Sequence, residues 1–266
     1  MKLLLCIALL FAAAGVSADT ITIKGSTTEL PMLESIGRSF AKEHAKSAVN
    51  VTGGGSGSGI EALFSGKADI ASSSRFLTQD EIHNAAARDV YPIPFRIAYD
   101  GIVPIVNRRN PVRSLSTLEL KAIYSGEISN WQKLGGPDLP IAVISRDFNS
   151  GTHEVWNQKV MHDVPVKTAQ PLMSSNHAVI TQVQNNPAAI GYISLAYLDS
   201  RVKPLAVNGV MGSMGNIKNG HYLLSRPLFL FTNQWPKGQL QAFIDYVLDP
   251  HQGQRQIERT GYIPLY

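Results

Sequence analysis

The sequence predicts an α/β protein built from two lobes with a ligand cleft between them. Short apolar strands alternate with amphipathic helices along most of the chain, which favours mostly parallel sheets covered by helices. A long β-rich stretch, residues 91–107, is interrupted by prolines and is typical of a connection that leaves one sheet and enters another. Residues 226–233 then predict a strand that returns to the first sheet. Two units joined by such extended crossings would leave a cleft between them.

The first unit reads as three strands, each followed by a helix. In the first helix, Leu30, Leu33, Ile36 and Phe40 recur on one face, and Thr78 is placed to cap the third. The predicted elements are strand 20–25, helix 29–43, strand 48–53, a helix around 60–64, strand 68–74 and helix 78–89.

The second unit continues the alternation, and the chain ends in one or two packed helices. We place the first lobe at residues 19–98 and 225–266, and the second lobe at 99–224. The predicted elements of the second unit are helix 116–124, strand 140–146, a helix from about 151, helix 176–185 and strand 189–195, and the closing helices fall within 237–262.

The N-terminus has the pattern of a secretory signal peptide. Lys2 precedes an apolar run, and Val16-Ser17-Ala18 gives a small-residue cleavage pattern that predicts a cut after Ala18. The run is too short for a membrane anchor. The one cysteine, Cys6, lies inside this leader, so a mature chain would hold its fold by a buried core without disulfides. We therefore expect a periplasmic protein, with release outside the cell as an alternative.

The charge of the chain is mildly basic. Loss of the leader with its one lysine lowers the formal net charge from +4 to +3. Such an excess fits an acidic ligand or partner, although net charge bears on steering and solubility more than on a site.

The first candidate loop, residues 24–31, joins a strand to a helix. Gly25 allows a tight turn, and Thr27 and Thr28 arrive as the helix begins. One interpretation is that either threonine simply caps the helix; the other is that both bind a ligand. Glu29, in the first helical turn, suits the positive end of the helix dipole.

The second candidate loop begins with three glycines at residues 53–55. Without Cβ atoms, the backbone there can approach a ligand closely, and Ser56 and Ser58 add hydroxyl groups beside the free N–H groups of a helix start. The loop lacks the lysine of a Walker A motif. A flexible linker is the alternative, but linkers rarely run from a strand into an apolar helix.

Two further loops carry arginine. Arg146 ends a strand and precedes Ser150, Gly151 and Thr152 at a helix start, and a guanidinium can donate to two oxygens at once. Residues 71–75 end another strand and bring Ser74 with Arg75.

The four loops together predict an anion site. Open α/β sheets bind ligands at the C-terminal ends of their strands. One helix N-terminus contributes roughly 0.3–1 kcal/mol toward an anion, and a hydrogen bond to a charged group about 1.5–3 kcal/mol. Stripping water from an oxyanion costs several kcal/mol, so several converging loops are needed.

These motifs, in their order and spacing, resemble the secreted phosphate-binding proteins that feed bacterial phosphate ABC transporters. The likeness covers nearly the whole chain after the leader and includes "GSTTELP", "GGGSGSGIEALFSGKADIASSSR", "YDGIVPIVN", "IYSGEISNW" and "SRDFNSGT". It implies a type II periplasmic binding-protein fold and a non-enzymatic receptor for inorganic phosphate. It also implies an inner-membrane permease and its ATPase as partners, with no nucleic acid, no membrane anchor, no cofactor and no metal, and a monomeric state.

The resemblance also carries over residue by residue. It implies phosphate contacts from Thr27, the Thr28 backbone, Ser56 and Ser58, and from Arg146, Ser150, Gly151 and Thr152. Many members have a proton-accepting aspartate where this chain has Ser74, followed by Arg75 as in a shorter "SSR" branch. This departure leaves rejection of sulfate open. Asp100 could replace the acceptor or brace an arginine.

Other functions remain as alternatives. The ligand could be another tetrahedral oxyanion such as sulfate, molybdate or phosphonate. A secreted phosphoesterase could use Ser150 with His153, although no carboxylate is evident in the sequence to orient that imidazole. A sensory or surface role without a transporter is a third possibility. The basic cluster at residues 107–113 is interpreted as a solvated surface, because no aromatic platform for nucleic acid accompanies it.

Overall fold

The computed structural model describes residues 19–44 and 47–266. The predicted leader, residues 1–18, lies outside the described residues. Strands and helices alternate as expected. The strands are β1 (Asp19–Gly25), β2 (Ser47–Thr52), β3 (Ile70–Ser73), β4 (Pro92–Val106), β5 (Ser114–Leu115), β6 (Ala142–Val143), β7 (Ala189–Ser194), β8 (Lys203–Pro204), β9 (Ala206–Val207) and β10 (Ser225–Asn233). The α-helices are α1 (Leu30–Glu43), α2 (Ser56–Phe64), α3 (Gln79–Ala87), α4 (Thr117–Tyr124), α5 (Gly151–Trp156), α6 (Asn176–Asn185), α7 (Met214–Lys218), α8 (Gly238–Leu248) and α9 (Gly253–Arg259).

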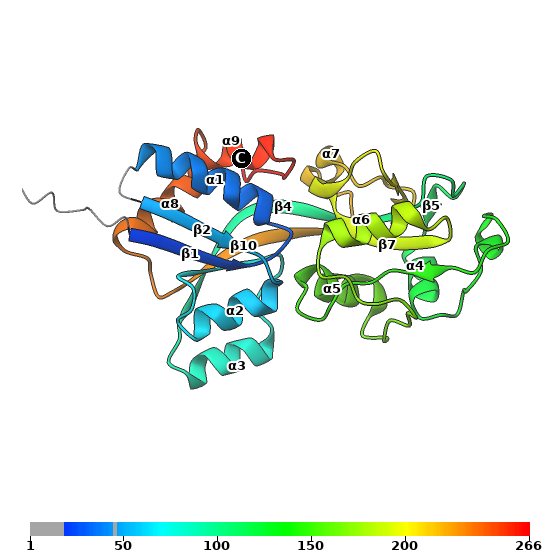
Figure 1. Cartoon of the computed structure of the whole chain (residues 1–266), viewed down its shortest axis with the longest axis horizontal. Helices are drawn as coiled ribbons and strands as arrows, with labels where there is room; N and C mark the ends of the chain where they lie inside the picture. The colour runs from blue at the N-terminus through cyan, green and yellow to red at the C-terminus, as the bar shows by residue number, and fades with distance from the viewer. Residues whose placement is uncertain (1–18, 45–46) are drawn as a thin grey trace, which may run out of the picture.

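One sheet runs through both halves of the molecule in the order β2-β1-β3-β10-β4-β7-β6, with β8 paired to β4. In Figure 1, the strands β4 and β10 cross from the left half to the right half. The pairs β1–β2, β1–β3 and β6–β7 are parallel, whereas every pair that β4 or β10 makes in this sheet is antiparallel. The sheet is therefore mixed, because β10 runs against β3 in the left half and β4 runs against β7 in the right half. The expectation of mostly parallel sheets is corrected in this respect.

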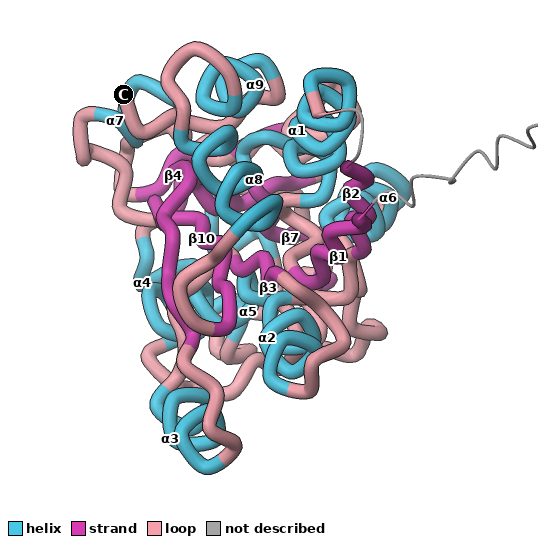
Figure 2. The backbone as a smooth tube through the Cα atoms, turned by 90° about the vertical axis from the view of Figure 1, so that its left-hand side faces the viewer, coloured by secondary structure: helices cyan, strands magenta, loops and turns pink. Residues whose placement is uncertain are grey.

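Helices cover both faces of the sheet in each half. On the left of Figure 1, α1, α8 and α9 lie above the strands, and α2 and α3 lie below them; the end-on view of Figure 2 shows the same layers. The buried core of this half includes Ile23, Ile36, Phe40, Leu228 and Phe243. This packing explains why the predicted apolar stripe of the first helix faces inward.

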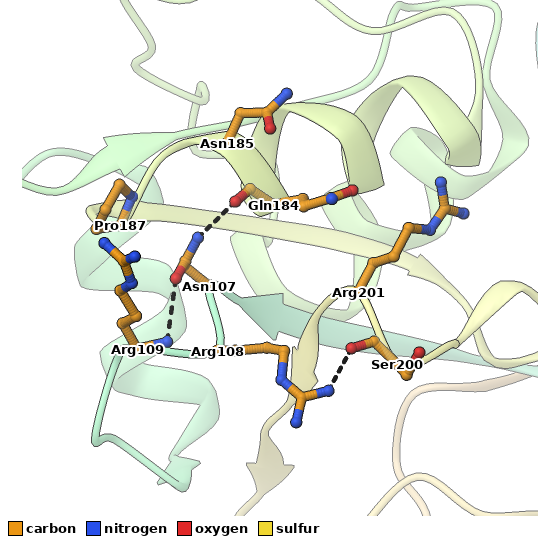
Figure 3. Close-up of a pocket in the computed structure, with 8 residues that line it drawn as sticks. All are labelled: Asn107, Arg108, Arg109, Gln184, Asn185, Pro187, Ser200 and Arg201. Carbon is orange, nitrogen blue, oxygen red and sulfur yellow. Dashed lines mark hydrogen bonds between the residues drawn. The ribbon is translucent and has the colours of Figure 1, made fainter.

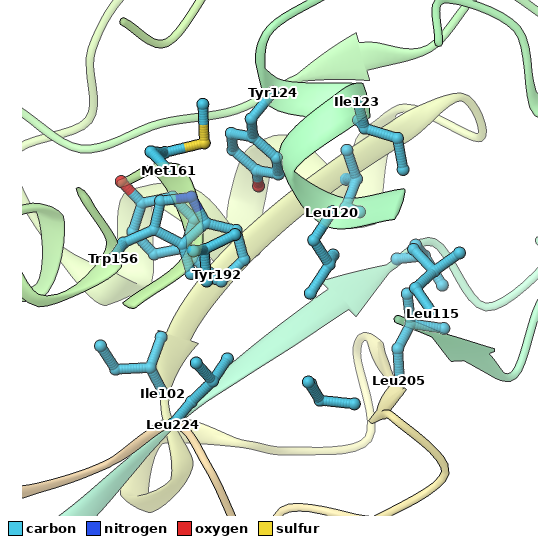
Figure 4. Packing of buried hydrophobic residues seen from close by; sticks show 14 of the residues in the cluster. Ile102, Leu115, Leu120, Ile123, Tyr124, Trp156, Met161, Tyr192, Leu205 and Leu224 are labelled. Atoms are coloured by element: carbon cyan, nitrogen blue, oxygen red, sulfur yellow. The ribbon is translucent and has the colours of Figure 1, made fainter. Parts of the chain in front are cut away.

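The core of the right half packs around aromatic rings (Figure 4). Trp156 stacks on Tyr192 with ring centroids 4.3 Å apart and an interplanar angle of 7°. Tyr124 lies 4.9 Å from the Trp156 ring. This stack fixes the position of the Tyr192 hydroxyl, which belongs to the site described below. The lobe boundaries remain a prediction; the buried clusters change from one half to the other between Ala98 and Ile102 on β4.

Several elements differ from the prediction. The expected strand at 140–146 is reduced to β6, because the chain beyond Ile144 turns to bridge Met173 through Arg146. The short strands β5, β8 and β9 and helix α7 were not predicted, because their sequences show no periodic pattern of apolar residues. Thr78 caps α3 as predicted, in a capping box with Glu81. Among the helices of the described residues, none has the length and apolar composition needed to cross a bilayer.

A close backbone contact at Gly59 gives the first testable prediction. A Cβ at Gly59, in α2, would lie 2.4 Å from both Gly25 Cα and the Lys24 carbonyl oxygen, and neither backbone atom can move away easily. We expect Gly59→Ala to lower the free energy of unfolding by about 1–3 kcal/mol, the usual cost of overpacking. Urea denaturation followed by circular dichroism measures the change.

The matched control is Gly215→Ala, in helix α7. A Cβ at Gly215 meets no atom within 4 Å. Alanine is the better helix former, so this variant should gain about 0.5–1 kcal/mol. Equal stabilisation by both substitutions would contradict the close contact at Gly59.

Candidate functional site

Four loops that are distant in the sequence meet around one small buried cavity. Its empty volume is about 120 Å³. That volume counts all the space between the lining atoms, which in this closed arrangement stand too close together to leave room for a water-sized sphere. The lining residues are Ser26, Thr27, Thr28, Gly55, Ser56, Ser74, Ser150, Gly151 and Thr152.

The cavity lies where strands end and helices begin. β1 leads into the first loop and β3 leads to Ser74, while α2 begins at Ser56 and α5 at Gly151. The first N–H groups of a helix have no partner within it. Two helix starts therefore bring free donors to a cavity whose side chains are all hydroxyls.

The structure excludes capping as the role of the two threonines. The N-cap of α1 is Glu29, and no side chain caps that helix. The Thr28 hydroxyl instead lies 3.2 Å from the Thr152 hydroxyl, and the Thr27 hydroxyl accepts a hydrogen bond from Arg146. Both threonines thus join the two halves of the molecule. Ser150 does cap α5 by accepting from the His153 backbone N–H, while it also lines the cavity.

Arg146 is 1% exposed, and one of its nitrogens has no hydrogen-bond partner in the described part of the chain. Its Nε donates to the Met173 carbonyl at 2.9 Å, and its Nη2 donates to Thr27 Oγ1 and the Ser174 carbonyl, both at 3.1 Å. The Nη1 atom is buried and has no hydrogen-bond partner among the described residues. Burial lowers the pKa of the Arg146 guanidinium, which nevertheless remains charged in a protein.

The aromatic stack positions the backbone around Arg146. The Tyr192 hydroxyl accepts from the Arg146 N–H at 3.3 Å and lies 3.0 Å from Ser145 Oγ. Burial raises the pKa of Tyr192 to about 12, so the hydroxyl keeps its proton at neutral pH. The core of the right half therefore determines where the guanidinium lies.

A second buried arginine, Arg226, was missed by sequence reasoning. It lies on β10 directly opposite Asp100 on β4, and the two form an ion pair with Nη2 2.8 Å from Oδ2. Its Nη1 donates to Thr152 Oγ1 at 3.0 Å and its Nη2 to Thr28 Oγ1 at 3.2 Å. Asp100 thus braces an arginine, one of the two roles considered for it. A lone charge in the otherwise apolar stretch 226–231 was the available signal.

Ser56, Ser74 and Gly151 lie in close contact. The Ser56 hydroxyl accepts from the Ser74 N–H at 3.1 Å and lies 3.4 Å from the Ser74 hydroxyl. A Cβ at Gly151 would lie 2.4 Å from Ser56 Oγ and 2.7 Å from Ser74 Oγ. Glycine is therefore required if the two halves are to close over the cavity.

Further hydrogen bonds hold the halves together. The Gly57 N–H donates to the Asn149 carbonyl at 3.1 Å, and the Tyr197 hydroxyl donates to the Thr27 carbonyl at 2.7 Å. These contacts, with those of Arg146 and Arg226, describe a closed arrangement in which the cavity is shut off from bulk water.

Three of the predicted site residues, Ser58, Arg75 and Arg146, lie outside the cavity lining. Ser58 is exposed on α2. Arg75 donates to both carboxylate oxygens of Glu81 at 2.6 and 2.7 Å, so its guanidinium is engaged with α3. Arg146 hydrogen-bonds to Thr27, which lines the cavity, and the remaining predicted residues line it as well.

His153 lacks the geometry of a catalytic base toward Ser150. Its ring Nδ1 lies 3.3 Å from the Tyr192 hydroxyl, and only its backbone N–H reaches Ser150 Oγ. Burial lowers the pKa of His153. Within residues 19–44 and 47–266, no group of three or more acidic, histidine or cysteine side chains is arranged to hold a metal ion.

The larger hollows of the surface have a different character. One of them, with an empty volume of about 890 Å³, is shown in Figure 3. There, Arg108 donates to the Ser200 carbonyl, and Arg201 forms an exposed ion pair with Asp199 at 2.6 Å. Residues that line this hollow lie beyond the end of β4 and at the end of α6, and no helix begins among them to offer free N–H groups, so its size does not make it the better candidate.

Comparison with known proteins identifies the family. A family model described as a PBP superfamily domain matches residues 12–251. The phosphate-binding protein PstS of Borreliella burgdorferi is 30% identical over 258 residues, covering 92% of this chain and 90% of that protein. PstS of Bacillus subtilis is 28% identical over 254 residues, covering 94% and 82%.

Solved structures agree with the sequence comparison. A Clostridium perfringens structure with bound phosphate, of a substrate-binding protein assigned to a phosphate ABC transporter, has a TM-score of 0.86 and 30% identity. It covers 93% of this chain and all of that one. An ABC-type phosphate transport receptor from Vibrio cholerae has a TM-score of 0.76 and 32% identity, covering 91% and 99%. The resemblance predicted from the motifs is thereby confirmed, and the chain belongs to the PBP superfamily, with the two-lobe fold of periplasmic binding proteins.

Proposed function

We propose that this protein is a receptor that binds inorganic phosphate in the buried cavity between its lobes and delivers it to an ABC transporter. The observation that carries the proposal is the free Nη1 of Arg146, since a buried donor without a partner costs about 1–3 kcal/mol. An anion in the neighbouring cavity would satisfy this donor. The named relatives and solved neighbours, which are phosphate-binding or phosphate-transport proteins, support phosphate as the anion.

The cavity supplies enough donors for an oxyanion that has lost its water. Hydroxyl groups of Thr27, Ser56 and Thr152 line it, together with the first residues of α2 and α5. Each hydrogen bond to the charged ligand contributes about 1.5–3 kcal/mol. Several such bonds together offset a desolvation cost of several kcal/mol. The few bonds from a single loop would not offset that cost.

The partners in this proposal are an inner-membrane permease and its ATPase, and the protein acts as a monomer in the periplasm after removal of its leader. Catalysis is not part of the proposal. The hydroxyl of Ser150 already accepts a backbone N–H, and the His153 ring is directed to Tyr192. A phosphoesterase would need that ring to take the Ser150 proton.

Replacement of Arg146 tests the proposal directly. Arg146→Ala removes a charged donor from a buried site, a change that costs about 2–5 kcal/mol in buried charged contacts. Phosphate should therefore bind roughly 30-fold to several thousand-fold more weakly, as measured by isothermal titration calorimetry. Arg38→Ala, which removes the same charge from an exposed side chain of α1, should bind normally. Normal affinity in Arg146→Ala would contradict the assignment.

A second candidate ligand is sulfate, because the cavity lining contains hydroxyl groups but no carboxylate. A serine hydroxyl can accept a hydrogen bond from protonated phosphate. Unlike a carboxylate, it carries no negative charge to repel sulfate, which has no proton to donate. We expect sulfate to compete measurably with phosphate for the native protein. Ser74→Asp should weaken sulfate binding at least about tenfold, equal to roughly 1.4 kcal/mol, while phosphate, which carries a proton, still binds.

Ser58→Asp is the matched control, since it adds the same charge to the exposed face of α2 outside the cavity. Competition calorimetry across pH compares the three proteins. If sulfate competes equally in all of them, Ser74 does not face the anion.

A further inference from the structure

Glu29 is a buried carboxyl group with no role in the site described so far. It is 0% exposed, and neither carboxyl oxygen has a hydrogen-bond partner within the described residues. It stands at the N-cap of α1, but its side chain makes no cap bond. An acidic residue that served only the helix dipole would usually lie at the surface, in contact with water.

Charged and titratable groups from three other segments act on Glu29 electrostatically. Arg226 on β10 attracts its negative charge, whereas Asp100 on β4 repels it. Tyr262, which follows α9, is also within electrostatic range and donates its hydroxyl to the Thr28 carbonyl. The Ser26 hydroxyl, which lines the anion cavity, lies close enough to favour the ionised form slightly. Glu29 is thus connected to the cavity through Ser26 and through Arg226.

The charge of Arg226 is already balanced. Its Nε and Nη2 both donate to Asp100 Oδ2, at 3.1 and 2.8 Å. Burial of Glu29 outweighs the attraction of Arg226 and raises the pKa of the Glu29 carboxyl well above its usual value. The ionised form is the unfavourable one here, because burial takes the carboxylate out of water and neither Arg226 nor the Ser26 hydroxyl compensates for that loss.

The protonation state of Glu29 sets the charge around the cavity. Among the fully buried charged side chains of the described residues, with Glu29 uncharged, the Arg226–Asp100 pair is neutral and Arg146 leaves one net positive charge; the half-buried Asp147 beside Arg146 is the same in both states. With Glu29 ionised, that net charge falls to zero. We propose that Glu29 binds a proton together with the anion, so that its uncharged form keeps the cavity receptive. This inference rests on the proposed function, because it assumes that the cavity binds an anion.

The sign of the linkage follows from electrostatics. A bound anion disfavours a second negative charge nearby and so raises the pKa of Glu29 further. By reciprocity, protonation of Glu29 strengthens anion binding. Affinity should therefore be highest below the pKa of Glu29 in the free protein. Above it, affinity should fall by up to about tenfold per pH unit, because each binding event must take up a proton.

The experiment is calorimetric titration of inorganic phosphate from weakly acidic to alkaline pH, in two buffers with different ionisation enthalpies. The difference between the buffers gives the protons taken up on binding. Phosphate itself titrates in this range, but equally for every variant. Glu29→Gln keeps the shape of the uncharged side chain. Glu34→Gln, at a half-exposed position of the same helix, is the matched control.

We expect Glu29→Gln to bind phosphate with a shallower loss of affinity at alkaline pH and with less proton uptake than the native protein, whereas Glu34→Gln behaves as native. Identical pH profiles in the native protein and Glu29→Gln would overturn the inference and leave the phosphate site intact. A Glu29→Gln protein weakened by the same factor at every pH would also overturn it, because that result indicates a structural role. If none of the three proteins binds phosphate, the proposed function itself is wrong.

A second measurement covers the case in which Glu29→Gln does not fold. Difference infrared spectra of the native protein at alkaline pH, with and without phosphate, detect protonated carboxyl groups. The inference requires the protonated carboxyl signal to increase on phosphate binding. No increase would overturn it.

Discussion

The arrangement of the site depends on the buried guanidinium of Arg146. A guanidinium cannot give up its charge in a protein, so burying one is tolerable only if its donors are satisfied. The Met173 and Ser174 carbonyls and the Thr27 hydroxyl take three of the five N–H groups. The remaining pair, on Nη1, has no partner among the described residues. We infer that an anion bound in the neighbouring hydroxyl-lined cavity accepts these two N–H groups.

The crossing strands supply the second part of the electrostatics. Because β4 and β10 pair across both halves, Arg226 lies directly opposite Asp100 and forms an ion pair with it. Arg226 also donates hydrogen bonds to the hydroxyls of Thr28 and Thr152. Because the Arg226–Asp100 pair is neutral, ionisation of Glu29 would add one negative charge near the cavity and offset the positive charge of Arg146. The same pair of strands therefore connects the lobes mechanically and holds the charge balance of the site.

Much of the fold and part of the site could be predicted from the sequence. The alternation of strands and helices is a local pattern, so α1, α6 and the long strand β4 were expected close to their observed positions. Thr27, Ser56 and Ser150 could be expected together because ligand loops follow strand ends. Arg226 could not, since its role depends on the register with β4 rather than on its neighbours in sequence. From the sequence, Glu29 is an ordinary acidic residue at a helix start. Its burial away from water depends on tertiary packing, which the local sequence does not show. Two-residue strands such as β5 and β9 carry too few residues for any period to be visible.

The decisive measurement is a crystal structure of the protein grown with inorganic phosphate, which would locate the anion relative to Arg146. We expect phosphate between the first loop and the start of α5, with one oxygen within hydrogen-bonding distance of Arg146 Nη1. Phosphate held instead at the surface arginines of Figure 3, with the Arg146 nitrogen still unpaired, would contradict this expectation.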